Sequence, residues 1–259
     1  MPTKLGQNFL RNTTVLEKII KTSDLKDDDF VIEIGPGEGV LTEELSKYAN
    51  KVIAIELDDN LIPLLEKKFA DKKNVEIIHD DILKINLSEL IAGYKLQTTN
   101  YKLIANIPYY ITSPIIRLFL EQTIQPKEII LLIQKEVAER IAAKAGQMSI
   151  LAVSVQYYGS AEIMFEVDKN SFFPVPKVDS AVIKIIPQKK FNKETDKKFF
   201  RIVKAGFSAK RKTLLNNLAS SLQLDKNAVS AKIETAGISP TVRAQELSIE
   251  NWKKLVKLF

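Results

Sequence analysis

The sequence predicts an α/β fold, with a mostly parallel and doubly wound sheet followed by a small all-α domain. Between about residues 30 and 135, short apolar runs alternate with amphipathic stretches at the spacing of β-α-β units. The apolar runs are nearly continuous, as is typical of parallel strands that are covered on both faces. After Pro187 the composition changes to lysine-rich helical segments. We therefore expect two domains, at 1–187 and 188–259.

Strands and helices of the first domain can be placed in order. The parallel strands are predicted at 30–34, 51–56, 75–78, 102–106 and 128–134. The intervening helices are expected near 38–48, near 60–69 and from Ser113 onward. Pro63 fits the second of these because the first turn of a helix does not need every backbone N–H. Strands near 161–167 and 180–186 should form an antiparallel edge.

The second domain is predicted to be helical throughout and strongly basic. Its helices are expected at roughly 194–207, 212–222, 225–236 and 248–258. Residues 189–259 hold sixteen Lys and Arg against six Asp and Glu, a net charge of +10, whereas the whole chain carries +6. The rest of the chain is therefore mildly acidic, at −4. Such a basic tail is typical of a domain that binds a polyanion, although a solvated helical surface would give the same pattern.

Composition excludes several classes of site. The 259 residues contain no cysteine and a single histidine, His79, so disulfide scaffolds, thiolate metal sites and cysteine nucleophiles are excluded. A zinc site is not expected, and we predict no metal. No apolar run approaches the roughly 20 residues of a membrane span. The N-terminus lacks the apolar core of a secretion signal, so we expect a cytoplasmic protein with no membrane partner.

A glycine-rich turn follows the first strand of the predicted sheet. Gly35, Gly37 and Gly39 join this strand to a helix, and Glu56 ends the next strand 21 residues after Gly35. In a doubly wound sheet, a carboxylate at that point binds the hydroxyls of a ribose. The pair Asp80-Asp81 after the third strand adds acceptors for an adenine amine. The pattern predicts a nucleoside cofactor.

Two kinds of cofactor fit the glycine turn, a nicotinamide dinucleotide and S-adenosylmethionine. The dinucleotide fingerprint places its third glycine at the position of Val40 in this chain. Glu38 in the same loop would repel a pyrophosphate. S-adenosylmethionine carries no phosphate and has a sulfonium cation, so acidic surroundings favour it.

The fourth strand ends in Asn106-Ile107-Pro108-Tyr109, residues suited to methyl transfer to a nucleobase amine. The lone pair of such an amine is delocalised into the ring, and accepting hydrogen bonds from its N–H groups frees that pair. The Asn106 side-chain oxygen and the Ile107 carbonyl can be the acceptors, with Pro108 holding the main chain. The Tyr109 ring offers the extruded base a stacking surface. Orientation and desolvation then provide most of the catalysis.

At this point the sequence resembles a known family, the adenine-specific rRNA dimethyltransferases. The resemblance rests on LGQNFL (5–10), EIGPGEG (33–39), the acids after strands two and three, and NIPYYITSP (106–114). FFPVPKVDSAV (172–182), GFSAKRKTLLNNL (206–218) and GISPTVRAQELS (237–248) are similar to the members that act on the small-subunit (16S-type) rRNA. The resemblance covers nearly the whole chain. One departure is Val175, where many relatives have proline.

The resemblance implies a Rossmann-like class I methyltransferase that dimethylates the N6 amines of two adjacent adenosines near the 3′ end of small-subunit rRNA. It implies action on pre-assembled small ribosomal subunits during biogenesis, by a monomer. The implied S-adenosylmethionine-binding residues are Asn8, Leu10, Gly35, Gly37, Glu56, Asp81 and Asn106. The implied catalytic residues are Asn106, Ile107, Pro108, Tyr109 and Phe172, with Tyr109 and Phe172 on opposite faces of the target adenine. The RNA-binding residues that we predict in the basic tail are Lys210, Arg211 and Lys212.

Other functions remain open from the sequence. A macrolide-resistance methyltransferase, which modifies large-subunit rRNA, shares the cofactor site and the Asn-Ile-Pro-Tyr motif. DNA adenine methyltransferases typically carry Asp at the position of Asn106. A ribosome-assembly or RNA-binding factor without catalysis would not need the intact motif. We expect His79 to be a surface residue and Trp252 to pack between helices.

Overall fold

The structure is a computed structural model that describes residues 8–108 and 111–259. The chain forms two compact units. The first comprises the chain up to Ala138 together with Ser160–Gln188, and the second comprises Glu139–Gly159 together with Lys189–Phe259. The second unit thus includes a segment that the sequence analysis assigned to the first domain. The division into domains at 1–187 and 188–259 stays a prediction.

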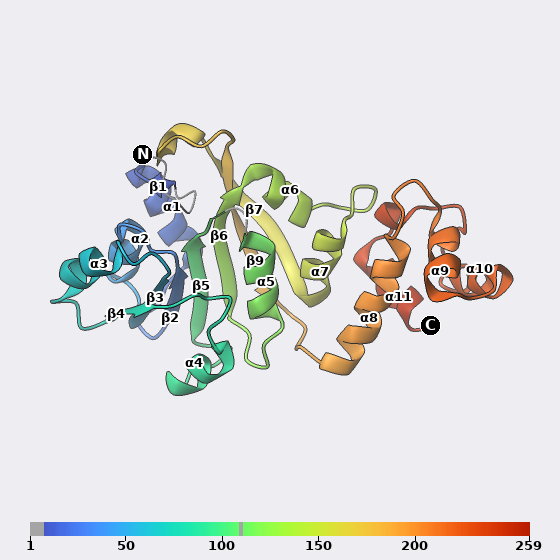
Figure 1. Cartoon of the computed structure of the whole chain (residues 1–259), viewed down its shortest axis with the longest axis horizontal. Coiled ribbons are helices and arrows are strands. Elements are labelled where there is room, and N and C mark those ends of the chain that lie inside the picture. Colours follow the sequence, from blue (N-terminus) through green and yellow to red (C-terminus); the bar gives the residue numbers. More distant parts are fainter. Residues whose placement is uncertain (1–7, 109–110) are drawn as a thin grey trace. The chain divides into compact units, whose positions relative to one another are not determined.

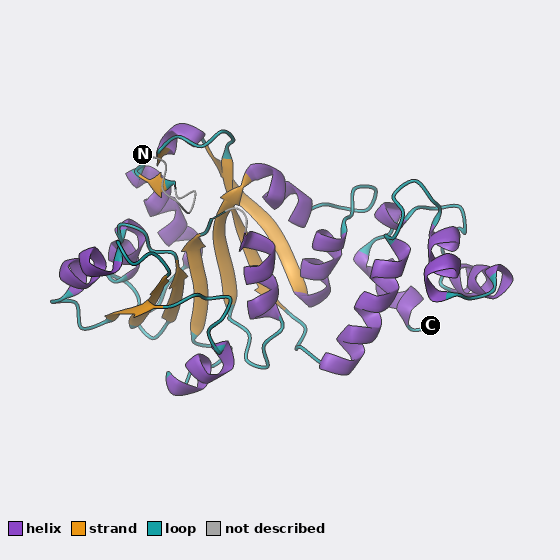
Figure 2. Ribbon diagram, in the orientation of Figure 1, coloured by secondary structure: helices purple, strands orange, loops and turns teal. Residues whose placement is uncertain are grey.

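A seven-stranded sheet forms the centre of the first unit, as Figures 1 and 2 show. Its order is β4 (Val75–His79), β3 (Lys51–Glu56), β2 (Phe30–Ile34), β5 (Tyr101–Asn106), β6 (Glu128–Gln134), β9 (Ser180–Pro187) and β7 (Gly159–Val167). The neighbouring pairs from β4 to β6 are parallel, and β9 is antiparallel to β6. The α/β fold with a mostly parallel sheet is therefore confirmed.

The strand order reverses between β2 and β5, and this reversal positions the site. From β2 the chain proceeds through β3 to β4 on one side, and then returns to β5 and β6 on the other. The register aligns Ile34 with Ile55, and Asn106 with Leu132. The carboxyl ends of β2, β3, β4 and β5 therefore meet at one edge. Doubly wound sheets bind their ligands at such a reversal.

Helices flank the strands of the first unit. They are α1 (Thr13–Ser23), α2 (Val40–Leu45), α3 (Ile62–Phe69), α4 (Leu87–Gly93), α5 (Thr112–Leu120) and α6 (Lys135–Ile141), the last of which continues into the second unit. Pro63 lies in the first turn of α3, as predicted. A separate two-stranded sheet pairs β1 (Phe9–Leu10) with β8 (Phe172–Phe173), which follows the short helix η2 (Lys169–Ser171).

The second unit is helical where the structure describes it. It contains α7 (Ile150–Tyr158), α8 (Lys193–Gly206), α9 (Leu214–Leu222), α10 (Lys226–Thr235), η3 (Ala244–Glu246) and α11 (Ile249–Val256). The Trp252 ring is fully buried and stacks on Phe207, and its six-membered ring occupies the space where Gly206 has no side chain. The prediction that Trp252 packs between helices is confirmed.

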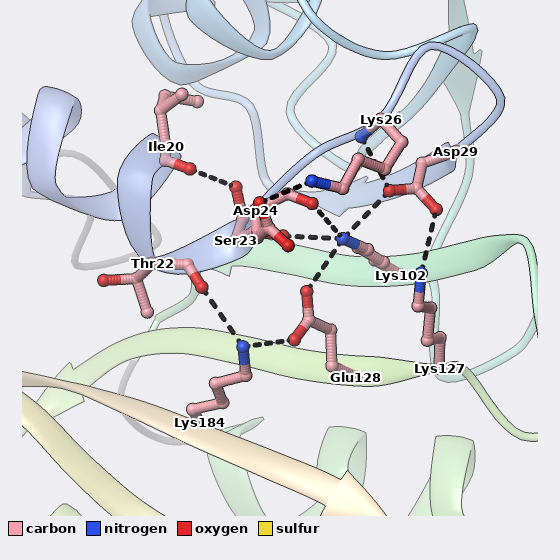
Figure 3. Close-up of polar contacts among 10 residues, drawn as sticks. All are labelled: Ile20, Thr22, Ser23, Asp24, Lys26, Asp29, Lys102, Lys127, Glu128 and Lys184. Carbon is pink, nitrogen blue, oxygen red and sulfur yellow. Dashed lines mark hydrogen bonds and ion pairs between the residues drawn. The ribbon is translucent and has the colours of Figure 1, made fainter.

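A buried ion-pair cluster lies at the amino-terminal ends of the strands of the large sheet, away from the carboxyl edge (Figure 3). The ammonium group of Lys102 on β5 lies 2.9 Å from a carboxylate oxygen of Asp29 and 2.9 Å from one of Glu128. It also donates to the carbonyl oxygens of Ser23 and Asp24 at the end of α1. Charges removed from water need such close partners. The cluster therefore joins α1 to β5 and β6 and leaves the carboxyl edge free for a ligand.

Candidate active site

A pocket opens at the carboxyl edge of the sheet, beside the reversal in strand order. Its lining comes from β1, from the glycine loop after β2 and from the ends of β3, β4 and β5. All seven residues that the sequence analysis assigned to the cofactor line it. Acids gather there too: Glu33, Glu38, Glu56, Asp80 and Asp81. Among the described residues that line the pocket, none is Lys, Arg or His.

The glycine loop holds the backbone where a side chain would not fit. Gly37 has a φ of +60°, and a Cβ placed on it would lie 3.0 Å from the Phe9 ring. Gly39 has a φ of +73°, and a Cβ there would lie 2.7 Å from Phe69 on α3. Such left-handed conformations favour glycine. The loop can therefore turn closely over the pocket and start α2 directly afterwards.

Glu56 ends β3 with its carboxylate held by backbone N–H groups. One oxygen accepts from Gly37 at 3.1 Å, and the other accepts from Leu57 and Asp58 at 2.9 Å each. The side chain is buried, yet a carboxylate can accept about four hydrogen bonds, so capacity remains for a ligand. These contacts fix Glu56 at the pocket wall in a single orientation.

The acids after β4 lie on the rim of the pocket. Asp81 accepts a hydrogen bond from the Leu83 backbone N–H at 3.0 Å, and its other oxygen lies 3.2 Å from the Lys84 ammonium. His79, the residue before this pair, is half exposed and lies 2.8 Å from a carboxylate oxygen of Asp59. The expectation of a surface histidine is confirmed.

Asn106 ends β5 with its amide oriented by the N-terminal segment. The amide nitrogen Nδ2 donates to the Asn8 carbonyl at 3.3 Å, which leaves the side-chain oxygen Oδ1 as the acceptor for a ligand. Ile107 is buried, and Pro108 lies against Gly35. Asn106, Ile107 and Pro108 thus share the pocket with the predicted cofactor residues. Tyr109 lies outside the described residues.

Phe172 and Phe173 occupy opposite sides of the small sheet. Phe172 pairs with Leu10 and is only 3% exposed, within the core of the first unit. Phe173 pairs with Phe9, which lines the pocket, and is 65% exposed. Directly opposed residues of antiparallel strands point to the same face. Stacking by Phe172 stays a prediction; Phe173, which the sequence analysis did not select, is the exposed ring of β8 in this structure.

Glu33 is a second residue that the sequence analysis did not select. It lies within β2, is 1% exposed and lines the pocket. Its oxygen Oε2 has no hydrogen-bond partner among the described residues. Burial raises the pKa of Glu33 to about 8, and the nearby charge of Glu56 acts in the same direction. An acidic residue inside an otherwise apolar strand was the signal in the sequence.

The predicted RNA-binding residues lie together in the second unit. Lys210, Arg211 and Lys212 are exposed in the turn before α9, and no described carboxylate lies within ion-pair distance of them. Asn217 of α9 holds this turn, because its amide nitrogen donates to the carbonyl oxygens of Gly206 (2.6 Å) and Ala209 (3.0 Å). Ser208, which lies at the start of this turn, does not cap α9. The cap is Thr213, whose hydroxyl accepts from the backbone of α9.

The described part of the chain contains no group of three or more His, Cys, Asp or Glu side chains that could hold a metal ion. None of its helices combines the length and the apolar character needed to cross a bilayer.

Comparison with known proteins places the chain among rRNA-modifying enzymes. The family model described as "Ribosomal RNA adenine dimethylase" matches residues 1–259. The chain is 48% identical over 255 residues to "Ribosomal RNA small subunit methyltransferase A" of Dehalococcoides mccartyi, covering 97% of this chain and 86% of that one. The protein of the same name from Alkaliphilus metalliredigens is 45% identical over 258 residues, covering 98% and 90%.

Solved structures show the same similarity. A dimethyladenosine transferase from Plasmodium falciparum superimposes with a TM-score of 0.77 and 28% identity, covering 95% of each chain. The 23S rRNA methyltransferase ErmE superimposes with a TM-score of 0.76 and 27% identity, covering 97% of this chain and 99% of that one.

Proposed function

The chain belongs to the ribosomal RNA adenine dimethylase family, and from this membership we propose that it dimethylates two adjacent adenosines near the 3′ end of small-subunit rRNA. As a member of the family it is a methyltransferase for rRNA adenine, and its cofactor is S-adenosylmethionine. The target atoms are the N6 amines, and the substrate is the pre-assembled small ribosomal subunit. We propose that the protein acts as a monomer, in the cytoplasm, during ribosome biogenesis.

The charge of the pocket lining fits this cofactor. Five acids and no described basic residue line it, and one buried carboxylate oxygen, Oε2 of Glu33, has no hydrogen-bond partner among the described residues. A pyrophosphate would meet only negative charge there, whereas a sulfonium cation is compatible with it. We propose that Glu56 binds the ribose hydroxyls, Asp81 the adenine amine, and Gly35 and Gly37 the methionine part. Asn8 and Leu10 close the pocket from the N-terminal segment.

The orientation of the Asn106 amide is the observation that carries the proposed chemistry. Because Nδ2 donates to the Asn8 carbonyl, Oδ1 is the atom that accepts an N–H of the target amine. The Ile107 carbonyl accepts the second N–H, and Pro108 keeps the main chain in place. When bound, S-adenosylmethionine supplies a methyl group on a sulfonium centre. After the first methylation only one N–H remains, so one acceptor suffices for the second.

Stacking completes the proposed recognition of the target base. We propose that the rings of Tyr109 and Phe172 hold the extruded adenine from its two faces, as the resemblance implies. Stacking of a base on an aromatic ring contributes roughly 1–3 kcal/mol. Because Phe173 is the exposed ring of β8, comparing Phe172→Ala with Phe173→Ala identifies which ring the base uses.

The choice of small-subunit rRNA rests on sequence rather than on fold. The two solved relatives have nearly equal TM-scores, so the fold does not separate them from each other. The identity of 45–48% to proteins named for the small subunit, against 27% to ErmE, favours the small subunit.

Methylation of isolated ribosomal subunits tests this proposal. Small and large subunits that lack the modification are incubated separately with the protein and S-adenosylmethionine, and the rRNA is analysed by mass spectrometry. We expect two adjacent N6,N6-dimethyladenosines in the small-subunit rRNA and none in the large-subunit rRNA. Methylation of the large subunit alone would support the macrolide-resistance activity instead, and binding to the small subunit without methylation would support an assembly factor.

A further inference from the structure

Glu33 differs from the other buried carboxylates of the protein. Asp29 and Glu128 lie beside Lys102, Asp196 lies beside Lys189, and Glu56 accepts three backbone N–H groups. Among the described residues, neither a cation nor a backbone donor contacts Oε2 of Glu33. A buried, ionised carboxylate with an unpartnered oxygen is costly, and burial of this kind favours the protonated acid.

The groups that surround Glu33 explain why no neighbour supplies the missing charge. On α2, the Thr42 hydroxyl favours the charged form and so opposes part of the effect of burial, and on β3, the Glu56 carboxylate repels a negative charge. On α3, the Lys68 ammonium attracts it from a distance, but it is held by the Glu43 carboxylate at 3.0 Å and the Gly39 carbonyl at 3.1 Å. The remaining pocket acids, Glu38, Asp80 and Asp81, are also anionic groups. No described base faces Glu33 across the pocket.

We propose that Glu33 releases its proton when S-adenosylmethionine binds, and that the carboxylate then balances the positive charge of the cofactor. The inference rests on the proposed function for the identity of the cofactor. The charge balance is simple, since a neutral acid and a cation become a carboxylate, a bound cation and a proton in solvent. Because burial raises the pKa of Glu33 to about 8 in the free protein, the acid holds its proton at neutral pH.

This arrangement distinguishes the cofactor from its product. Methyl transfer removes the sulfonium charge, so the product S-adenosylhomocysteine is neutral overall. The product therefore stabilises the ionised form of Glu33 less than the cofactor does. The carboxyl group can then take a proton again, which weakens its interaction with the product. Affinity for the cofactor should rise about tenfold per pH unit below a pKa of about 8 and level off above it. Glu33 is therefore a residue that links cofactor exchange to proton uptake.

Calorimetric counting of protons tests the inference. S-adenosylmethionine is titrated into the full-length protein at pH 6.5 in several buffers of different ionisation enthalpy, and the slope of the binding enthalpy gives the protons released. This pH lies below the usual pKa of an α-amino group, about 7.7–8.0, so the cofactor's own amine contributes little. We expect close to one proton for the wild type and close to none for Glu33→Gln. S-adenosylhomocysteine should release fewer protons than the cofactor.

Matched controls keep the test independent of folding and of the rRNA substrate. Glu38→Gln removes a pocket acid that is partly exposed and ion-paired with Arg11, and its proton count should match the wild type. Difference infrared spectroscopy of the wild type should show the band of a protonated carboxylic acid disappearing when cofactor is added. Persistence of that band, or equal proton release by Glu33→Gln and wild type, would overturn the inference. If the protein releases the expected proton on cofactor binding but does not methylate rRNA, only the proposed substrate is overturned.

Discussion

Glu56 shows how the backbone around one side chain prepares it for a ligand. Three backbone N–H groups fix its two oxygens and so hold the carboxylate at the pocket wall. One of these donors is Gly37, whose left-handed conformation turns its N–H toward β3. The spacing of Glu56 from the glycine turn was enough to predict its place from the sequence. Its hydrogen bonds could not be predicted, because they depend on how the loop folds over the strand.

Replacing Glu56 tests the proposed role in cofactor binding. Glu56→Ala should weaken S-adenosylmethionine binding by about 1.5–3 kcal/mol, the usual contribution of a hydrogen bond to a charged group. Isothermal titration calorimetry measures the affinity, and Asp59→Ala, which removes an exposed acid in the loop after β3, is the control. An unchanged affinity for Glu56→Ala would place the ribose elsewhere.

Elements were predicted well where their pattern was strong. The strands at 51–56 and 128–134 were predicted to the residue, because continuous apolar runs between turns leave little ambiguity. Helix α7 was missed, because its sequence ILAVSVQYY is apolar on every side and rich in β-branched residues. Its helical state depends on burial and on the Ser149 hydroxyl, which accepts from the Ala152 backbone at 3.1 Å. Short helices such as α4 lack a long periodic pattern and were missed as well.

The amino-terminal ends of β5 and β6 depend on Lys102. Lys102→Met would leave the buried Asp29 and Glu128 without their central cation, so we expect a loss of about 3–5 kcal/mol in the free energy of unfolding. Urea denaturation measures this loss.

The same substitution at an exposed ion pair is the control for Lys102. Lys26→Met breaks only the surface pair with Asp24, and should cost less than about 1 kcal/mol. Cofactor affinity of the folded Lys102→Met protein should match the wild type, because the cluster lies at the other end of the strands. Equal stability losses for the two variants would mean that the buried cluster is not a structural support.

Charge is distributed unevenly across the whole molecule. Residues 189–259 carry a net +10, while the cofactor pocket in the other unit is lined by acids. This separation suits a protein that binds a cationic cofactor and a polyanionic substrate with different surfaces. The charge count was available from the sequence. The placement of Lys210, Arg211 and Lys212 in a turn held by Asn217 was not, because it requires the side-chain contacts of a folded helix pair.

Charge reversal in this turn tests whether it binds RNA. Arg211→Glu with Lys212→Glu should weaken binding to the small subunit and lower the log–log salt slope by about 0.9 for each duplex phosphate that the turn no longer neutralises. Lys253→Glu with Lys257→Glu makes the same change of charge on exposed positions at the end of the chain and is the control. Cofactor affinity should be unaffected in both. If the two double variants weaken binding equally, net charge rather than this turn governs association.

We propose that Asn106, at the edge of the cofactor pocket, activates an adenine amine of small-subunit rRNA. Single-turnover methylation of small subunits at saturating cofactor tests this role, with mass spectrometry counting the methyl groups on each adenosine. The wild type should place two methyl groups on each of the two target nitrogens. Asn106→Ala should bind the subunit normally and methylate at least about 100-fold more slowly, the loss seen when one transition-state hydrogen bond is removed. A near-normal rate for Asn106→Ala would contradict the proposed role of Asn106, and a wild-type product that stops at one methyl group would contradict the proposed dimethylation.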